Sequence, residues 1–261
     1  LLDGLQMEPS TGTSRAEPEP SSEARAEGSK RFFFAASSEG STRSLAARRL
    51  NVVSVSPGSG TLQAALDAAS AGDVLELQDG NYTGTGDNVL EIDKNITIRA
   101  ANVGQAIIDG EEARRVILVT SGTVVFEGLD ITRGYWSHEW GAGVRIEGGG
   151  NMEFKHCEIH HNTATDGAYG GGVVTHAGFT ADAVFEYCDI HDNSSPAFGG
   201  GLCLYGGANI DVNFCNIYNN TATLGGAGIY RHSPAVTIEC STVDDAVQGT
   251  VSYVACSPSS P

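Results

Sequence analysis

The sequence has few basic residues, no long apolar segment and none of the short motifs that mark phosphate-binding or thiolate zinc sites. Its 15 Lys and Arg residues stand against 32 Asp and Glu, a formal net charge of −17. This excess argues against nucleic acid as a partner, because phosphates require a basic surface. No run of 18 apolar residues occurs, so the chain offers no transmembrane segment. The patterns G-x-x-x-x-G-K-[ST] and C-x-x-C are also missing.

One pattern occurs four times between residues 126 and 220, at intervals of about 30 residues. Each copy leads into a glycine-rich segment, and the chain has 34 glycines. The full copies are Phe154-x-x-Cys157-x-Ile159-x-x-Asn162, Phe185-x-x-Cys188-x-Ile190-x-x-Asn193 and Val212-x-x-Cys215-x-Ile217-x-x-Asn220. A degenerate copy, Phe126-x-x-Leu129-x-Ile131, has Gly134 where the asparagine would fall. Such a period indicates units that bury their apolar faces by stacking on neighbours.

Each repeat contains three short pieces in which apolar and polar residues alternate, separated by Gly, Asn, Asp and Ser. Alternation of this kind predicts strands, and three strands per repeat predict one coil of a parallel β-helix. Less regular apolar runs upstream fit earlier coils. Residues 61–71 place Leu62 and Leu66 on one face and predict a helix that covers the first coil. We therefore expect an all-β solenoid with three sheets over residues 51–250.

Stacked coils place equivalent residues directly above one another, about 4.8 Å apart. Two interior ladders follow, one of small buried thiols and one of amides that pair between coils. The expected ladders are Cys157, Cys188 and Cys215, and Asn162, Asn193 and Asn220. The alternative is a metal site built from these cysteines and asparagines, which the lack of closely paired cysteines disfavours.

The upstream segments also support a resemblance to a known superfamily. Residues 61–80, followed by N-Y-T-G, I-T-I-R-A and A-I-I-D-G, resemble the opening of pectin-lyase-like right-handed β-helix proteins. The downstream units resemble the β-helix repeats of polymorphic outer membrane proteins. The resemblance implies a right-handed β-helix. It leaves activity open, because the superfamily contains lyases, hydrolases, epimerases, adhesins and inert spacers.

The ends of the chain are expected to lie outside the β-helix. Residues 1–50 are rich in Ser, Glu, Ala, Arg and Pro and predict a disordered or processed segment, and residues 251–261 form a tail. The chain begins with Leu1 and shows no targeting signal, so we expect a fragment or a processed product.

The compartment is indicated only by cysteines and glycosylation motifs. Cys203 is expected on an outward strand position, and Cys240 and Cys256 either form a disulfide or remain free thiols. The candidate glycosylation sites are Asn81, Asn95 and Asn219. Together these features favour an extracellular or cell-surface location.

The repeat register brings acidic and imidazole side chains to one outer face. The residues after the reference Cys or Leu positions predict an outward row of Asp130, Glu158 and Asp189 beside His160 and His191. This row is either solvated surface, a source of acid and base for glycan cleavage, or a calcium site completed by Asp192.

Catalytic signatures of the superfamily are mostly missing. A polygalacturonase-like site would need N-x-D, D-D, G-H-G and R-x-K motifs, and only Asn209-Ile-Asp211 and Asp244-Asp245 occur. Aromatic residues suited to contact sugar rings, or alternatively to pack loops, are Tyr135, Trp136, Trp140, Tyr169 and Tyr218.

Two function classes follow. The first is a non-catalytic secreted or cell-surface β-helix that binds glycans, acts as an adhesin or serves as a spacer, with a glycan surface or another protein as its partner. The second is a polysaccharide lyase or glycoside hydrolase that uses the carboxylate and histidine row. Neither requires a cofactor, and calcium is the one candidate ion.

Overall fold

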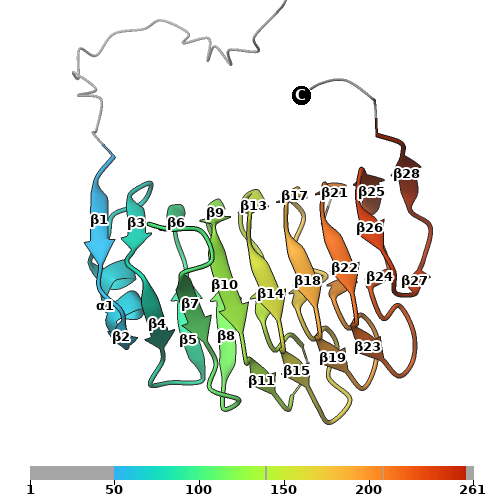
Figure 1. The fold of residues 1–261 in the computed structure, drawn as a ribbon, viewed down its shortest axis with the longest axis horizontal. Helices are drawn as coiled ribbons and strands as arrows, with labels where there is room; N and C mark the ends of the chain where they lie inside the picture. The colour runs from blue at the N-terminus through green and yellow to red at the C-terminus, as the bar shows by residue number, and fades with distance from the viewer. Residues whose placement is uncertain (1–49, 139, 208, 257–261) are drawn as a thin grey trace, which may run out of the picture. The chain divides into compact units, whose positions relative to one another are not determined.

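The computed structural model describes residues 50–138, 140–207 and 209–256. The predicted disordered N-terminus lies outside the described residues except for residue 50. Of the predicted tail 251–261, residues 251–256 are described, and Ser252–Val254 form a strand that pairs with the preceding coil. Within the described part, strand after strand pairs in parallel with its equivalent in the next coil (Figure 1). The predicted parallel β-helix is confirmed. No helix in this part is long and apolar enough to cross a membrane.

Four sheets run along the stack of coils, and we name them A to D. Sheet A contains β1 (Val52–Val55), β3 (Val74–Leu77), β6 (Ile96–Ala100), β9 (Val124–Glu127), β13 (Met152–Lys155), β17 (Ala183–Glu186), β21 (Asn209–Asn213), β25 (Ala235–Glu239) and β28 (Ser252–Val254). Sheet B contains β2 (Gly58–Ser59), β4 (Gly80–Thr83), β7 (Ala106–Asp109), β10 (Leu129–Thr132), β14 (Glu158–His160), β18 (Asp189–His191), β22 (Asn216–Tyr218) and β26 (Thr242–Val243).

The other two sheets complete each coil. Sheet C contains β5 (Asn88–Ile92), β8 (Arg115–Val119), β12 (Val144–Ile146), β16 (Val173–Thr175), β20 (Leu202–Leu204), β24 (Ile229–Arg231) and β27 (Val247–Gln248). Sheet D contains β11 (Tyr135–Trp136), β15 (Thr163–Ala164), β19 (Ser194–Ser195) and β23 (Thr221–Ala222). Sheet D adds a short fourth sheet to the three expected, because the residues just after the asparagine turn pair between coils before the chain reaches its glycine segment.

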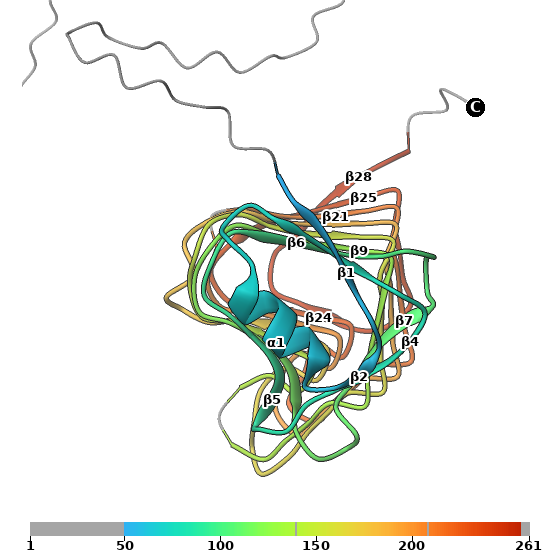
Figure 2. The same ribbon diagram turned by 90° about the vertical axis from the view of Figure 1, so that its left-hand side faces the viewer.

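The single helix of the described part, α1 (Thr61–Ala68), lies over the open end of the first coils (Figure 2). Its Leu62 and Leu66 side chains are buried against the core. The helix ends three residues earlier than the predicted 61–71, because Ala69 already has extended backbone angles. A helix in this place covers apolar side chains that a further coil would otherwise bury.

The interior consists of stacked identical or similar side chains. Phe126, Phe154 and Phe185 stack with centroid separations of 4.9 and 4.8 Å. The repeat cysteines also lie inside, unpaired, and are at most 2 % exposed; they are Cys157, Cys188 and Cys215. Because each side chain repeats at the same place in every coil, one choice of residue type fills the core along its length.

The repeat asparagines form a buried hydrogen-bonded ladder next to this core. The Nδ2 of Asn193 donates to the Ile159 carbonyl at 2.8 Å and to Asn220 Oδ1 at 3.0 Å. Asn193 Oδ1 in turn accepts from the backbone and side-chain amides of Asn162, at 3.1 and 3.0 Å. In the last coil, Asp245 replaces asparagine and accepts from Asn220. Each amide therefore fixes both the turn of its own coil and the distance to the next.

Truncation of this ladder tests its contribution to stability. Asn193→Ala leaves the Asn162 donors without their acceptor in a dry interior, so we expect the free energy of unfolding to fall by about 2–4 kcal/mol. The control Asn216→Ala removes an exposed amide from the neighbouring strand and should change stability by less than about 0.5 kcal/mol. Chemical denaturation monitored by circular dichroism measures both. Equal effects would mean that the ladder adds no stability beyond an ordinary surface amide.

A disulfide between Cys240 and Cys256 ties the terminal strand β28 to the turn after β25. The two cysteines are 16 residues apart. Closing a loop of this length lowers the entropy of the unfolded chain and can stabilise the folded state by up to about 3 kcal/mol. We expect Cys256→Ser to increase amide hydrogen exchange over residues 240–256 and to leave sheet A of the central coils unchanged. Unaltered exchange in residues 240–256 would contradict a stabilising role for this bond.

Candidate functional site

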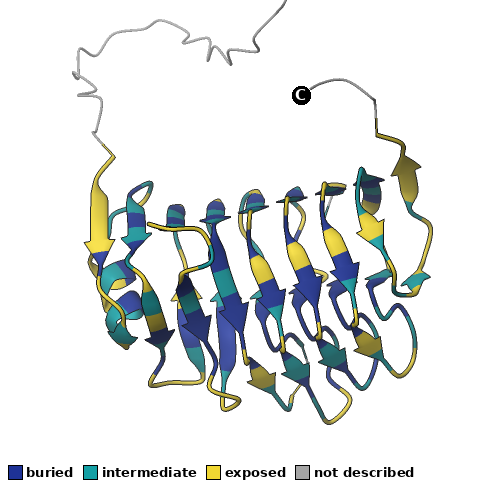
Figure 3. Ribbon diagram, viewed as in Figure 1, coloured by how far each residue is buried: buried dark blue, intermediate teal, exposed yellow. Residues whose placement is uncertain are grey.

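The outer face of sheet B carries two columns of polar side chains in register across successive coils. The first column contains Asp130, Glu158, Asp189 and Asn216, and the second contains Thr132, His160, His191 and Tyr218. The isoleucine between the two columns points into the core in every coil, since side chains alternate along a strand. Figure 3 shows the result, with exposed, buried and partly buried residues alternating along β14 and β22.

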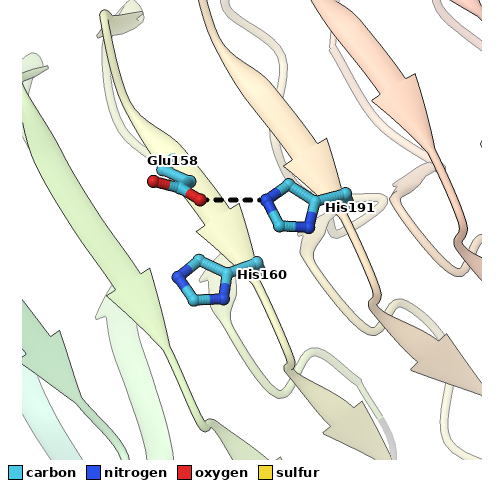
Figure 4. Close-up of side chains that lie close together, drawn as sticks. All are labelled: Glu158, His160 and His191. Carbon is cyan, nitrogen blue, oxygen red and sulfur yellow. Dashed lines mark hydrogen bonds and ion pairs between the residues drawn. The ribbon is translucent and has the colours of Figure 1, made fainter. Parts of the chain in front are cut away.

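Carboxylate–imidazole pairs link neighbouring coils on this face. The Nε2 atom of His160 lies 2.9 Å from Asp130 Oδ1, and Nε2 of His191 lies 3.0 Å from Glu158 Oε1 (Figure 4). The second ring nitrogen of His191, Nδ1, lies 2.7 Å from Asp192 Oδ2. Nδ1 of His160 lies 2.6 Å from Nδ1 of His161 and 3.3 Å from Thr132 Oγ1. Each histidine therefore contacts a carboxylate of the preceding coil with Nε2 and a further polar group with Nδ1.

The rings of the second column also stack. His160 and His191 are nearly parallel with centroids 5.1 Å apart, and His191 and Tyr218 are 4.7 Å apart. The outer face of sheet B thus presents a ladder of polar rings flanked by carboxylates. This geometry arises because the coil spacing and the ring-stacking distance are similar.

The electrostatic environment of the ladder is negative. Burial lowers the pKa of His160, but the hydrogen bond to Asp130 and the charges of Asp130, Glu158 and Asp192 outweigh it, so the pKa lies above its ordinary value. Burial, followed by the charges of Asp189, Glu158 and Asp192, raises the pKa of Tyr218. A positive or hydrogen-bond-donating ligand is favoured in such a field.

A groove of about 520 Å³ opens beside the first histidine of the ladder. Its lining residues are Asn81, Ile107, Asp109, Glu112, Asp130, Thr132, Arg133, His160 and His161. Arg133 is the one Lys or Arg among them, and it forms an ion pair with Asp109. The hydrogen bond and the charge of Asp109 raise the pKa of the Arg133 guanidinium, so this group stays protonated.

The four carboxylates predicted to share a calcium ion do not converge on one point. Asp130 contacts His160, Glu158 and Asp192 contact His191, and Asp189 accepts a hydrogen bond from Asn216 Nδ2 at 2.7 Å. Calcium binding by this row stays a prediction. The atoms that do come together are those of Glu158, His160 and His191, all within 4.8 Å of one another.

The aromatic residues predicted to contact sugars are distributed over three places. Tyr218 belongs to the ring ladder. Trp136 packs against buried alanines under sheet D, with the Arg115 guanidinium 4.0 Å from its ring. Trp140 and Tyr169 stack on each other beside sheet C, with centroids 4.9 Å apart. Tyr135 is 37 % exposed on β11. Only Tyr218 therefore shares the face with the carboxylate and histidine columns.

Four charged or imidazole residues of the groove escaped the sequence analysis, namely Asp109, Glu112, Arg133 and His161. Asp109 and Glu112 lie in the irregular upstream coils, where no repeat marks the register. Arg133 and His161 follow the second column at turn positions with positive φ, which strand alternation does not describe. Arg133 and His161 could have been found from the sequence, because they occupy equivalent positions in the aligned repeats, immediately after Thr132 and His160.

The remaining predicted sites are placed as follows. Asn81, Asn95 and Asn219 are all exposed, and glycosylation at them stays a prediction. Cys203 occupies an outward position on sheet C between Val174 and Tyr230, yet it is fully buried. The outward thiol is covered because the backbone of the Gly199 turn lies against Cys203.

Comparison with known proteins supports the fold. The model of the right handed beta helix region matches residues 85–259. This chain belongs to that family. The match also confirms the right-handed fold inferred from the sequence, while the likeness to polymorphic outer membrane repeats stays a prediction. No curated protein sequence matches the chain at a significant level.

Several solved structures are similar to this chain at low identity. The pectate lyase Pel9A is 17 % identical, with 78 % of this chain and 68 % of that chain covered and a TM-score of 0.46. The PL6 family alginate lyase AlyGC is 18 % identical, with a TM-score of 0.44. Here 78 % of this chain is covered but only 28 % of the lyase. An alginate lyase from Paenibacillus sp. str. FPU-7 is 14 % identical, covers 76 % of this chain and 99 % of its own, and has a TM-score of 0.29.

The four free cysteines provide no accessible nucleophile, since all are buried and burial raises the pKa of the Cys203 thiol. We expect a small alkylating reagent to modify none of them in the native protein and all of them in denaturant, as counted by intact mass. Cys203 is the informative position, because it lies outside the coil interior. Its rapid modification in the native protein would show that its cover opens.

Proposed function

We propose that the outer face of sheet B binds a polysaccharide and that the chain acts as a non-catalytic glycan-binding β-helix. The observation that carries the proposal is the combination of a polar groove with a ladder of rings on one rigid face. Carboxylate and amide oxygens accept hydrogen bonds from sugar hydroxyls, and rings such as that of Tyr218 offer apolar surface. Because the columns repeat from coil to coil, the face suits an extended chain of repeating units better than a small compact ligand.

The charge of this face favours a neutral glycan. Asp130, Glu158 and Asp189 repel a polyuronate, and Arg133, which would otherwise attract one, is already paired with Asp109. No lysine lines the groove and its arginine stays protonated, so any base there would be a histidine or a carboxylate. The negative charge, which repels a polyuronate, supports binding of a neutral glycan over elimination chemistry.

An extracellular or cell-surface location fits this function. Polysaccharide matrices lie outside cells, the Cys240–Cys256 disulfide suits an oxidising compartment, and the glycosylation motifs at Asn81, Asn95 and Asn219 are accessible. The same rigid face also serves an adhesin or a spacer that holds glycan chains.

A glycan array tests the proposal with the full chain and two variants of exposed or partly exposed tyrosines. We expect saturable binding to neutral polysaccharides and about fivefold to tenfold weaker binding by Tyr218→Ala, equivalent to about 1 kcal/mol. The matched control Tyr187→Ala removes a tyrosine that is 53 % exposed on the turn between sheets A and B. It should leave affinity unchanged. Equal affinity of both variants, or no binding to any glycan, would overturn the assignment of this face.

The same samples distinguish binding from catalysis. Bound glycans are assayed for new reducing ends and for unsaturated products, and we expect neither. Product formation that is lost in Glu158→Gln would instead identify the row as the active site of a polysaccharide lyase or glycoside hydrolase.

A further inference from the structure

Imidazole and carboxylate groups from two neighbouring coils meet at His191. Its two ring nitrogens face two carboxylates, Glu158 at 3.0 Å and Asp192 at 2.7 Å. Imidazole nitrogens and carboxylate oxygens held side by side are the ligand types that divalent transition-metal ions take in proteins.

We infer that Glu158, His160 and His191 bind one divalent transition-metal ion, with zinc as the representative ion. The cluster supplies one carboxylate oxygen and two imidazole nitrogens, all within 4.8 Å of one another (Figure 4). Ligands bonded at about 2.1 Å in a tetrahedral site lie about 3.4 Å apart. The widest pair therefore has to approach by about 1.4 Å at most, which small side-chain rotations provide.

The neighbouring residues are placed as supporting groups of a metal site. Asp192 faces Nδ1 of His191, which leaves Nε2, the atom nearest Glu158, free to bind the ion. Carboxylates that hold the far nitrogen of a metal-bound histidine fix its tautomer and increase its basicity. Asp130 contacts Nε2 of His160 and adds a further negative charge, while Nδ1 of the same ring lies 2.6 Å from Nδ1 of His161. Asp192 acts as a positioning residue and not as a required ligand.

The donor set distinguishes this site from the calcium site predicted from the sequence. Calcium takes six to eight oxygen ligands, whereas two imidazoles with one carboxylate suit zinc, nickel or cobalt. Three protein ligands also leave one coordination position open. His160 lines the groove, so this position can accept water or a hydroxyl group of a ligand in the groove.

Metal titration of the full chain, produced without a histidine tag and stripped with chelator, tests the inference. We expect one zinc ion per chain by calorimetry, and a visible absorption spectrum of four-coordinate cobalt when Co²⁺ is the probe. Zinc should raise the melting temperature, since an ion that binds only the folded state stabilises it by mass action. Calcium at millimolar concentration should neither displace cobalt nor produce the same shift.

Variants separate this site from adventitious binding. His160→Ala and His191→Ala should abolish the cobalt spectrum, and Asp192→Asn should weaken zinc about 10- to 100-fold with all three ligands intact. The control His156→Ala removes an exposed histidine from the same coil as His160 and should bind zinc normally. Circular dichroism in chelator checks that each variant is folded.

Several results would overturn the inference. One is that His160→Ala and His191→Ala still bind zinc. Another is that the His156→Ala control loses as much zinc affinity as they do. A third is that calcium raises the melting temperature and zinc does not. No saturable metal binding at all would mean that the carboxylate–imidazole contacts are ion pairs of a purely structural kind. The glycan array and the metal titration are independent, so failure of one leaves the other interpretable.

Discussion

Strict register between successive coils is the constraint on which every other feature of this protein depends. Main-chain pairing places each residue directly over its equivalent in the next coil, and the buried asparagine ladder holds the turns at the same spacing. Asn193, for example, satisfies donors and acceptors of the coils on both sides. If one coil moved by one residue relative to its neighbours, these buried amides would be left unpaired. The interior can then be filled by repeating one residue type per position, as the phenylalanine and cysteine stacks show.

The same register has the opposite consequence outside the core. A carboxylate at one outward position recurs about 4.8 Å away in the next coil, where the two charges repel. The structure offsets this repulsion by placing an imidazole of the next coil against each of two carboxylates, His160 against Asp130 and His191 against Glu158. The repeat therefore gathers carboxylate and imidazole groups on the outer face of sheet B, which would otherwise be ordinary solvated surface.

This concentration connects the two proposals for sheet B. A polar groove with a fixed, paired arginine suits recognition of hydroxyl groups, and an ion held by Glu158, His160 and His191 would lie at the edge of that groove. A rigid solenoid is well suited to both, because its side chains are placed by backbone pairing and not by mobile loops. Fold alone does not choose between binding and catalysis, since related architectures carry both.

The sequence by itself determined the β-helix, the two interior ladders and the membership of the two outer columns, because each of these depends on spacing that recurs in every repeat. Tertiary structure alone decided what happens where recurrence ends. The pairing of Asp109 with Arg133 arises in irregular coils, and the cover over Cys203 arises at a turn. The fourth sheet does recur in the repeats, but its two-residue strands are too short to show an alternating pattern. The convergence of Asp192 on His191 depends on side-chain torsions. Periodicity specifies which coil and which face a residue occupies, but not how its side chain turns toward neighbours from non-repeating segments.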